Sequence, residues 1–440
     1  MNILTRARVP VWPRPRATSD RPPEAALTPG AVQRGLRLSI VEGALSTVHI
    51  NVTTGAFVTG FALLLGASDF ELGLLGALPF IGQLFQFVGA YLEERLGTRR
   101  RLVVLTAAAS RSLWALIALL PFLGGLGAAR LSIFLLVLVI AQALIGIAGN
   151  AWMSWMSDLV PPQQRGRYFG VRNTVASISA MASVWLAGRV LDSYRGAGAE
   201  PLGYALIFGA GVACAIAGAL VLSRQPEPPL QRRARVRLRQ LFGAPLRHRS
   251  FRAFSLASAG WALATGVSAP FFNAYGIQDL KLSFSTLALM GVVTSCVTLI
   301  SQPLIGRLQD RYGDRRVLIG SVIGVVLLPL AWVVARPGLL LPLWLNAIGA
   351  GIFWPGITQG LVNLLMERAP AEGRGAYVAA YGAISGAGTL VAGLLGGALA
   401  SAVGTDLGSF GPLVLNHYTL LFIISSLGRA AMVFVFARRL

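Results

Sequence analysis

The sequence predicts an all-α membrane protein in which twelve transmembrane helices form two pseudo-symmetric bundles of six. Three observations predict this fold class. The chain of 440 residues is 55% hydrophobic and only 12% charged, about half the charged fraction of a soluble domain. Twelve apolar runs follow one another along the chain, each roughly as long as the 20 residues that cross a bilayer. Two polar motifs of the first half also return, in the same order, in the second half.

The twelve apolar runs are predicted to be helices, because inside hydrocarbon every backbone polar group needs a partner within the protein. A run such as LSIFLLVLVIAQALIGIAG is apolar on all sides, unlike a helix at the surface of a soluble protein. The runs are centred near Ile50, Gly82, Leu113, Ile140, Ala180, Val212, Ala264, Ser295, Val326, Phe353, Leu390 and Ile424.

The net charge of +21 indicates membrane orientation. With the N-terminus placed in the cytoplasm, 31 of the 38 Lys and Arg residues fall in the terminal segments and loops of that side. The positive-inside rule then predicts a multi-pass protein of the cell (inner) membrane with both termini in the cytoplasm. Outside the runs the basic residues are not interleaved with stacking aromatic residues, which argues against binding of nucleic acid.

Composition divides the chain into four parts. Residues 1–34 are rich in Pro and Arg and are predicted to be a disordered basic cytoplasmic tail. Residues 35–223 and 251–440 are predicted to form the N-terminal and C-terminal six-helix bundles. Between them, residues 224–250 form a basic cytoplasmic linker, either a solvated tether or in part an amphipathic helix on the anionic inner leaflet.

Two motifs reveal an internal duplication. AYLEERLGTRR at 90–100 aligns with GRLQDRYGDRR at 306–316 at an offset of 216 residues. DLVPPQQRGRYFG at 158–170 aligns with ERAPAEGRGAYVA at 367–379, which pairs Asp158 with Glu367 and Arg165 with Arg374. Duplication of six spans is typical of transporters that hold their pathway between the repeats.

The second-half copy resembles the loop signature G-x-x-x-D-R-x-G-x-R-R of the major facilitator superfamily. The matching residues are Gly306, Asp310, Arg311, Gly313, Arg315 and Arg316. The first copy has Ala90 in place of the first glycine and Glu94 in place of the aspartate, and it keeps Arg95, Gly97, Arg99 and Arg100. The resemblance implies two gating latches at the cytoplasmic side, of which the second is the better preserved; Asp158, Arg165, Glu367 and Arg374 are assigned to the same latches.

Glycine and charge suggest how the second latch works. Gly306 is expected to let its helix approach a neighbour closely, and Gly313 to permit a tight turn. Asp310 is expected to pair with Arg311 or Arg315, or to accept from the N-terminus of an adjacent helix. A role of the arginines in topology alone is the alternative.

Glu42 is the predicted proton-coupling residue. It is the only carboxylate well inside an apolar run, and it shares a helix face with Ser39, Ser46, His49 and Thr53. One alternative is that Glu42 lies near enough to the membrane surface to be solvated. Another is that Glu42 pairs with Arg111, which lies midway through the third run. In that case Glu42 stays ionised and the coupling hypothesis weakens. Arg429 lies nearer the end of its run and is expected to extend its charge to the membrane surface.

Aromatic and amide side chains predict the substrate site. The resemblance implies that the first, fourth, seventh and tenth helices line a central cavity, where such side chains suit a small amphipathic organic solute. Packing within the bundles is the alternative for each of them. The predicted substrate-binding residues are His49, Asn150, Trp152, Trp155, Trp261, Ser268, Phe272, Asn346, Phe353 and Trp354.

The sequence also limits the chemistry. Cys214 and Cys296 each stand alone in an apolar run, so no metal or cofactor is expected, and a phosphate-binding loop for ATP is missing. The resemblance therefore implies a secondary transporter, not an enzyme, that works as a monomer by alternating access. The fifth run lacks the glycine-proline pattern of drug/proton antiporters in the family, which argues against efflux by proton exchange. Two alternatives are a lipid or lysolipid mover with Arg111 at the headgroup, and a non-transporting receptor or assembly factor.

Overall fold

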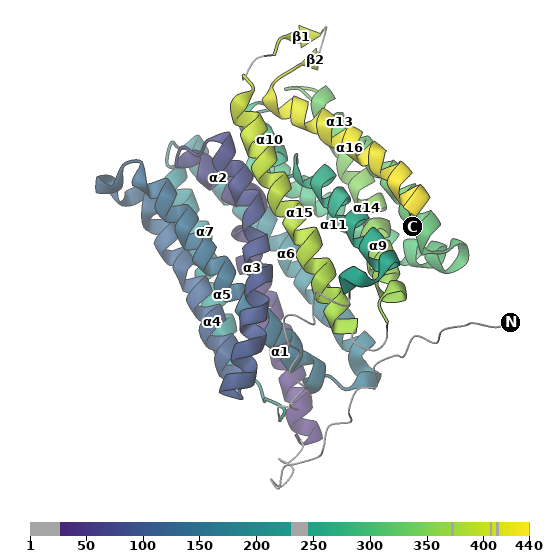
Figure 1. Ribbon diagram of the computed structural model, residues 1–440. Coiled ribbons are helices and arrows are strands. Elements are labelled where there is room, and N and C mark those ends of the chain that lie inside the picture. The colour runs from purple at the N-terminus through teal and green to yellow at the C-terminus, as the bar shows by residue number, and fades with distance from the viewer. Residues whose placement is uncertain (1–26, 230–244, 371–373, 405–406, 411–412, 440) are drawn as a thin grey trace, which may run out of the picture.

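The computed structural model describes residues 27–229, 245–370, 374–404, 407–410 and 413–439, with the backbone alone at 374–376, 409–410, 413 and 439. Its helices form two sets (Figure 1). The first bundle holds α1 (Pro29–Val52), α2 (Gly55–Leu64), α3 (Asp69–Leu96), α4 (Arg99–Leu119), α5 (Ala129–Leu159), α6 (Arg165–Gly196) and α7 (Glu200–Ser223). The second holds α9 (Arg249–Gly266), α10 (Phe271–Gln278), α11 (Phe284–Tyr312), α12 (Asp314–Val326), α13 (Leu328–Val334), α14 (Leu341–Arg368), α15 (Arg374–Ala402) and α16 (His417–Arg439).

Short elements complete the chain. One-turn 3₁₀ helices lie at Leu120–Phe122, Gly124–Leu126 and Pro162–Gln164. An antiparallel pair of two-residue strands, β1 (Ser409–Phe410) and β2 (Leu413–Val414), precedes α16. Apart from this hairpin and an isolated bridge between Arg336 and Leu339, the elements of the described residues are helices.

Eleven spans within the described residues are long and apolar enough to cross a membrane. The first of them, Pro29–Leu64, consists of α1 and α2 together. The predicted seventh run lies outside this set and consists of α9 and α10, which are separated at residues 267–270. Pro270 precedes α10, and a proline has no N–H group with which to continue the hydrogen bonds of a helix. With α9 and α10 as the twelfth crossing, the predicted fold class is confirmed.

Both bundles break their first helix at the same point of the repeat. Gly55 begins α2 with a φ of 60°, a conformation that favours glycine, and Phe271 begins α10 directly after Pro270. The offset of 216 residues between the first pair of motifs places Gly55 on Phe271. The internal duplication therefore extends from the loops to the helix breaks.

The helix bounds shift two of the predicted segment boundaries. α1 begins at Pro29, where the Thr28 hydroxyl accepts from the N–H of Ala31 at 3.3 Å, so residues 29–34 are helical and do not belong to the tail. At the start of the linker, Gln225 is fully buried and therefore is not part of a solvated tether. Residues 1–26 and 230–244, with the predicted amphipathic helix, lie outside the described residues.

The two ends of the molecule are named here by their loops. The hairpin end carries β1, β2 and the loops that join α2 to α3, α6 to α7 and α10 to α11 (Figure 1). The latch end carries the loops that join α3 to α4, α5 to α6 and α11 to α12, where the repeated motifs lie. The hairpin half and the latch half of the molecule are the parts nearer to these ends.

The hydrophobic core joins the bundles in one half of the molecule only. In the hairpin half a single cluster of buried residues combines Phe57, Phe61 and Tyr204 of the first bundle with Phe271 and Phe284 of the second. In the latch half the described residues form two separate clusters, one within each bundle. The bundles are thus packed together at the hairpin end, whereas each has a core of its own at the latch end.

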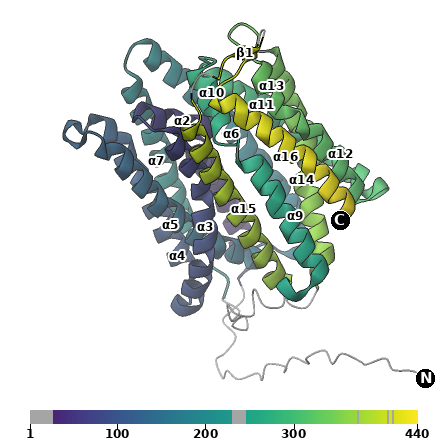
Figure 2. The same ribbon diagram turned by 45° about the horizontal axis from the view of Figure 1, so that its top comes forward.

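Small residues let the bundles approach each other in the hairpin half. α3 lies alongside α15 in both views, and α6 lies alongside α11 (Figure 2). A β-carbon at Gly73 of α3 would lie 2.4 Å from the carbonyl oxygen of Gly393 on α15. A β-carbon at Gly188 of α6 would lie 2.9 Å from the backbone of Ser285 on α11. Only glycine therefore fits at positions 73 and 188 without a shift of the neighbouring backbone.

Substitution of Gly73 by Ala is expected to destabilise the protein by roughly 1–3 kcal/mol, because the added methyl group overpacks the contact between α3 and α15. Thermal unfolding in detergent measures the effect. Gly209→Ala on α7 is the matched control, since no atom outside its own helix lies within 4 Å of the added β-carbon; there the better helix propensity of Ala is expected to hold or raise Tm. Equal changes of Tm in both variants would argue against the contact.

Candidate functional site

A pocket of about 240 Å³ lies at the seam between the bundles, beside the helix breaks. We call it the seam pocket. The carboxamide of Asn51 reaches it from the first bundle and that of Asn273 from the second. The rings of Phe57 and Phe284 also line it and stack with 6.2 Å between their centroids. The pocket thus offers hydrogen-bonding groups from both bundles beside an aromatic wall. The full lining is Asn51, Thr54, Gly55, Ala56, Phe57, Ala180, Met181, Val184, Asn273, Phe284, Leu287, Ala288, Gly291, Val292 and Ser295.

None of the ten predicted substrate-binding residues is part of this lining. Trp155 is fully buried, and its indole N–H donates to the carbonyl oxygen of Pro226 at 3.0 Å. Trp261 and Ser268 are buried in the second bundle. The ring of Phe272 stacks on Phe422 with 4.5 Å between the centroids. These four side chains pack within a bundle, which was the alternative interpretation of the aromatic stripe.

The other predicted substrate-binding residues also lie apart from the seam pocket. The ring of Phe353 packs against Gly324 of α12, because a β-carbon at position 324 would lie 2.4 Å from this ring. His49 is buried, with its ring edge-on to Trp114 at 6.1 Å. Trp354 lies 5.9 Å from Trp261 between ring centroids. Asn150, Asn346 and Trp152 are partly buried.

Sequence reasoning missed Asn51 and Asn273. The available signal was their position, because Asn51 stands four residues before Gly55 and Asn273 three residues after Pro270. Gly55 and Pro270 mark the two helix breaks. Broken helices in transporters expose backbone and side-chain polar groups near the membrane midplane.

Polar contacts close the hairpin end across the two bundles. The Asp192 carboxylate on α6 accepts from the backbone N–H groups of Phe284 and Ser285 at 2.7 and 2.8 Å, so it caps α11 of the other bundle. Asp69 on α3 accepts from the Tyr418 hydroxyl at 2.5 Å and lies 3.3 Å from Nε2 of His417. Asp192 and Asp69 thus join the two bundles by hydrogen bonds in the hairpin half.

The predicted coupling residue Glu42 is buried and ion-paired. Its Oε1 lies 3.4 Å from Nη2 of Arg111, so the predicted alternative pairing is present. The Ser46 hydroxyl donates to Glu42 and accepts from Arg111 at 2.7 Å. Nη1 of Arg111 also donates to the carbonyl oxygen of Ala215 at 3.4 Å. Arg111 on α4 is thus held by groups of α1 and α7.

A second arginine, which sequence reasoning missed, reaches the same carboxylate. Nη2 of Arg172 on α6 lies 3.7 Å from Oε2 of Glu42. Its guanidinium group lies over the ring of Trp152 at 4.6 Å from the centroid. Arg172 stands seven residues after Arg165, at which α6 begins, so it lies two turns inside the helix.

Arg429 does not extend to the membrane surface as expected. Its residue is only 3% exposed, and Nη1 donates to the carbonyl oxygen of Val325 at 3.1 Å. Its guanidinium group lies 5.9 Å from the ring centroid of Trp354. Arg429 lies ten residues before Arg439, where α16 ends, and its side chain therefore stays inside the second bundle.

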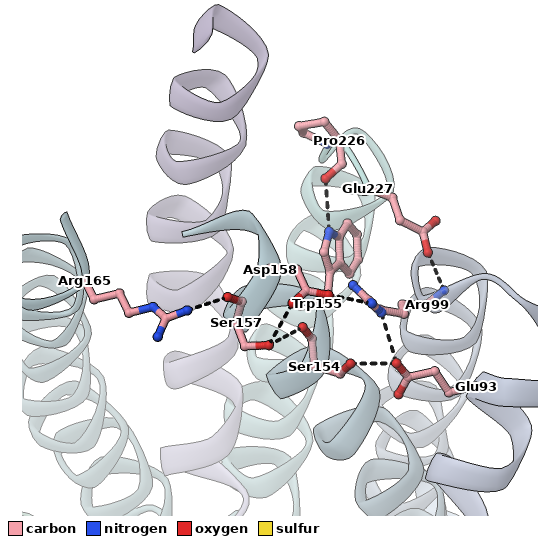
Figure 3. A network of polar contacts seen from close by, with 9 residues as sticks. All are labelled: Glu93, Arg99, Ser154, Trp155, Ser157, Asp158, Arg165, Pro226 and Glu227. Carbon is pink, nitrogen blue, oxygen red and sulfur yellow. Dashed lines mark hydrogen bonds and ion pairs between the residues drawn. The ribbon is translucent and has the colours of Figure 1, made fainter. Parts of the chain in front are cut away.

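At the latch end the first bundle holds a network of charged groups around Arg99 (Figure 3). Arg99 is 1% exposed, with Nε 3.0 Å from Glu93 and Nη2 2.7 Å from Asp158. Glu93 also accepts from the Ser154 hydroxyl at 2.6 Å. Glu227 of the linker accepts from the backbone N–H of Arg99, and so caps α4. The network ties α3, α4, α5 and the start of the linker together.

Part of the predicted first latch lies outside this network. Glu93 is the buried acid, whereas Glu94 and Arg95 are exposed and take part in no hydrogen bond or ion pair within the described residues. Arg165 donates to the carbonyl oxygen of Ser157 at 2.8 Å and so holds the turn between α5 and α6. The motif alignment put Glu94 in the place of the family aspartate, but the helix turns Glu93 toward the interior.

The second copy matches the motif better, but within the described part of the chain its residues form no buried ion pair like those of Arg99. Gln309 stands at the position of Glu93, and Arg315, at that of Arg99, donates to the carbonyl oxygen of Ala437 at 2.6 Å. Gly313 has a φ of 84°, which confirms the predicted tight turn. At Gly306 no neighbouring atom lies within 4 Å of a β-carbon position, so the expected close approach is wrong.

The remaining residues of the predicted second latch lie at the surface. Asp310, Arg311, Arg316 and Glu367 are exposed, and Asp310 forms none of its expected pairs within the described residues. The guanidinium group of Arg311 lies 5.3 Å from the ring centroid of Tyr312. Arg374 begins α15, and its side chain lies outside the described atoms.

Glu93→Gln is expected to destabilise the protein by roughly 1.5–3 kcal/mol, because the buried guanidinium group of Arg99 loses one of its two carboxylates. Glu94→Gln is the matched control, since Glu94 is exposed. Thermal unfolding of the purified variants separates them. A larger loss of stability in Glu94→Gln would show that the motif alignment identifies the structural acid correctly.

Asp192→Ala is expected to loosen the hairpin end, because α11 loses both acceptors at its N-terminus. In a variant without Cys214 and Cys296, a cysteine at Ala288 is expected to react about tenfold faster with a membrane-impermeant maleimide. Asp279→Asn is the control, because Asp279 contacts Asn416 of its own bundle at 2.7 Å. Unchanged labelling in Asp192→Ala would show that this cap does not keep the end closed.

Comparison with known proteins identifies the family. The sequence pattern of the Major Facilitator Superfamily matches residues 43–278 and 254–439. The multidrug resistance protein MdtG of Serratia proteamaculans (strain 568) is 26% identical over 243 residues, which are 48% of this chain and 58% of the relative. The chain thus matches somewhat more than half the length of that curated relative.

Solved transporter structures share the fold. A mutant form of the nucleoside transporter NupG superposes with a TM-score of 0.72 at 12% identity and covers 93% of this chain and 99% of its own. A D-xylose-proton symporter superposes with a TM-score of 0.65 at 18% identity, covering 92% and 97%. The solved structures show the fold, and the match of the family pattern to both halves shows that this multi-pass membrane chain belongs to the major facilitator superfamily, a family of transporters and not of enzymes.

Proposed function

We propose that this protein carries a small, amphipathic organic solute across the inner membrane as a secondary transporter, by alternating access and as a monomer. The observation that supports it most directly is the distribution of the hydrophobic core. One cluster spans both bundles in the hairpin half, and two separate clusters occupy the latch half. Such bundles can rock about the seam without unfolding, because the latch-half cores are independent.

The proposal places the latch end in the cytoplasm, with both termini. The distribution of Lys and Arg supports this orientation through the positive-inside rule. The state described here is then closed toward the outside by Asp69, Asp192 and the packing around Phe284. Opening to the outside requires these contacts to break, and new contacts at the latch end to replace them.

The seam pocket supports the class of solute. Two carboxamides and two hydroxyl groups can orient a polar group, whereas Phe57, Phe284 and the aliphatic side chains accept an apolar body. A pocket of about 240 Å³ suits a solute of modest size. The relative MdtG is named for multidrug resistance, and a structural neighbour for symport of D-xylose with protons; both are consistent with transport of an organic solute.

Proton coupling is proposed to run through Glu42. In the state described here the carboxylate is held by Arg111, and Arg172 lies nearby, so it takes up a proton only in a state in which these arginines have moved away. The three groups stand on α1, α4 and α6, which rearrangement of the first bundle can separate. Movement of the helices and protonation of Glu42 would then favour each other.

Glu42→Gln is expected to abolish uphill transport and to keep counterflow exchange near the wild-type rate, because the amide carries no titrating proton but retains hydrogen-bonding capacity. Proteoliposomes with an imposed pH gradient measure uphill transport. Preloaded proteoliposomes without a gradient measure counterflow exchange. The solute is chosen by a thermal-shift screen of metabolite and drug classes, since a ligand of the folded state raises Tm. Equal loss of both activities would assign Glu42 a structural role.

A further inference from the structure

The side chain of Arg172 on α6 occupies a seat formed by Gly43 of α1 and Trp152 of α5. A β-carbon at Gly43 of α1 would lie 3.0 Å from Cζ and Nη2 of Arg172, so the guanidinium group rests directly on the helix backbone. Trp152 of α5 covers it from the other side, with its ring centroid 4.6 Å from Cζ. A side chain larger than hydrogen at position 43 would require the guanidinium group to move. The side chain of Arg172 is therefore held in a defined place, as a binding group needs to be.

The guanidinium group of Arg172 lacks hydrogen-bond acceptors in this seat. Its nearest carboxylate oxygen, Oε2 of Glu42, is 3.7 Å away, which is beyond hydrogen-bond distance. Nε is buried and has no partner among the described residues. Arg111, by contrast, donates to Glu42, Ser46 and the carbonyl oxygen of Ala215. Of the two arginines at Glu42, Arg172 is the one with free donors.

The cluster also carries one positive charge in excess. Glu42 can neutralise Arg111 or Arg172, but not both. The other carboxylates on the helices around the seat are engaged or distant: Asp158 of α5 binds Arg99, Asp192 of α6 caps α11, and Glu200 of α7 lies 3.6 Å from Arg195 at the hairpin end. The titratable neighbours Tyr168 and His49 supply no negative charge at neutral pH.

Arg172 is more exposed than the two side chains of the Glu42–Arg111 pair. The side chain of Arg172 is 17% exposed, against 7% for Arg111 and 5% for Glu42. Arg172 lies in the latch half, where the bundles have separate cores. An incoming group therefore meets Arg172 first, with Trp152 beside it and the Glu42–Arg111 pair behind it.

We propose that Arg172 binds the anionic group, a carboxylate or a phosphate, of the transported solute, and that Trp152 contacts the adjoining apolar part. The proposal rests on the proposed transport function and specifies its substrate class as amphipathic organic anions. A guanidinium fork matches the two oxygens of such a group, and the anion supplies the negative charge that the cluster lacks. Glu42 then remains paired with Arg111 while the solute is bound.

Thermal unfolding of the full-length protein in detergent tests the binding step. Benzoate is compared with neutral benzamide, and phenyl phosphate with phenol; lysophosphatidylglycerol is compared with lysophosphatidylcholine to separate a soluble anion from a lipid headgroup. We expect at least one of the three anionic probes to raise Tm in a saturable manner, with the uncharged or zwitterionic partner ineffective. Equal shifts within all three pairs, or no shift by any anion, would overturn the proposal.

Variants assign the effect to the seat. Arg172→Gln is expected to raise the half-saturating concentration of the anion roughly 10-fold to 100-fold, and Arg172→Lys to restore part of the affinity. Arg189→Gln, an exposed site on the same helix, is the matched control and is expected to bind the anion as the wild type does. Arg172→Gln leaves Glu42 and Arg111 as a balanced pair; if it is poorly folded, Arg172→Met, which keeps an unbranched apolar stem beside Trp152, replaces it. Wild-type affinity in folded Arg172 variants would overturn the assignment.

Proteoliposome uptake separates this inference from the transport function itself. Uptake of neutral or cationic solutes, with no loss in Arg172→Gln, would leave transport established and the anion site refuted. Saturable anion binding at Arg172 without uptake of any solute would support the site and refute the transport function.

Discussion

The packing of Phe284 into the first bundle is the contact on which the arrangement of the two bundles depends. Phe284 begins α11 of the second bundle and is fully buried between Phe57 and Tyr204 of the first. Its backbone N–H donates to Asp192 at 2.7 Å, and the guanidinium group of Arg195 lies 5.5 Å from its ring centroid. Across the seam, Phe284 thus contributes a buried ring, a backbone N–H that Asp192 caps, and a cation–π contact with Arg195. Phe284 also lines the seam pocket, so the same side chain bounds the pocket and closes the hairpin end.

Two arginines of the first bundle, Arg99 and Arg172, show how the same side chain can stabilise a structure or remain available to a ligand. Two nitrogens of Arg99 face carboxylates within 3.0 Å, so its charge is balanced and the latch end of the bundle is fixed. Arg172 lies 3.7 Å from one carboxylate, that of Glu42, which is also paired with Arg111. A charge in a low-dielectric interior is costly unless it is paired, so the first arginine holds helices together and the second favours an incoming anion.

The two duplicated halves differ in the polar contacts of the corresponding arginines at the latch end. Gln309 in place of Glu93 removes the negative charge that would hold an arginine inside, and Arg315 accordingly binds a backbone carbonyl at the surface. The linker strengthens the difference, because Glu227 caps α4 of the first bundle. The first half is therefore held at the latch end by buried charged groups, and the described part of the second half by a contact with a backbone carbonyl at the surface.

The sequence by itself determined the fold class, the twelve crossings and the duplication, because bilayer thickness sets the length of an apolar run and charge sets the side on which a loop lies. It also indicated that Glu42 and Arg111 were possible partners, since both are costly inside a membrane unless paired. Only the tertiary structure decided that Glu93 and not Glu94 meets Arg99, that most of the aromatic stripe packs within the bundles, and that Arg172 reaches Glu42. These contacts join helices far apart in the chain, and the rotation of each helix about its axis follows from the packing of its neighbours, which no local pattern records.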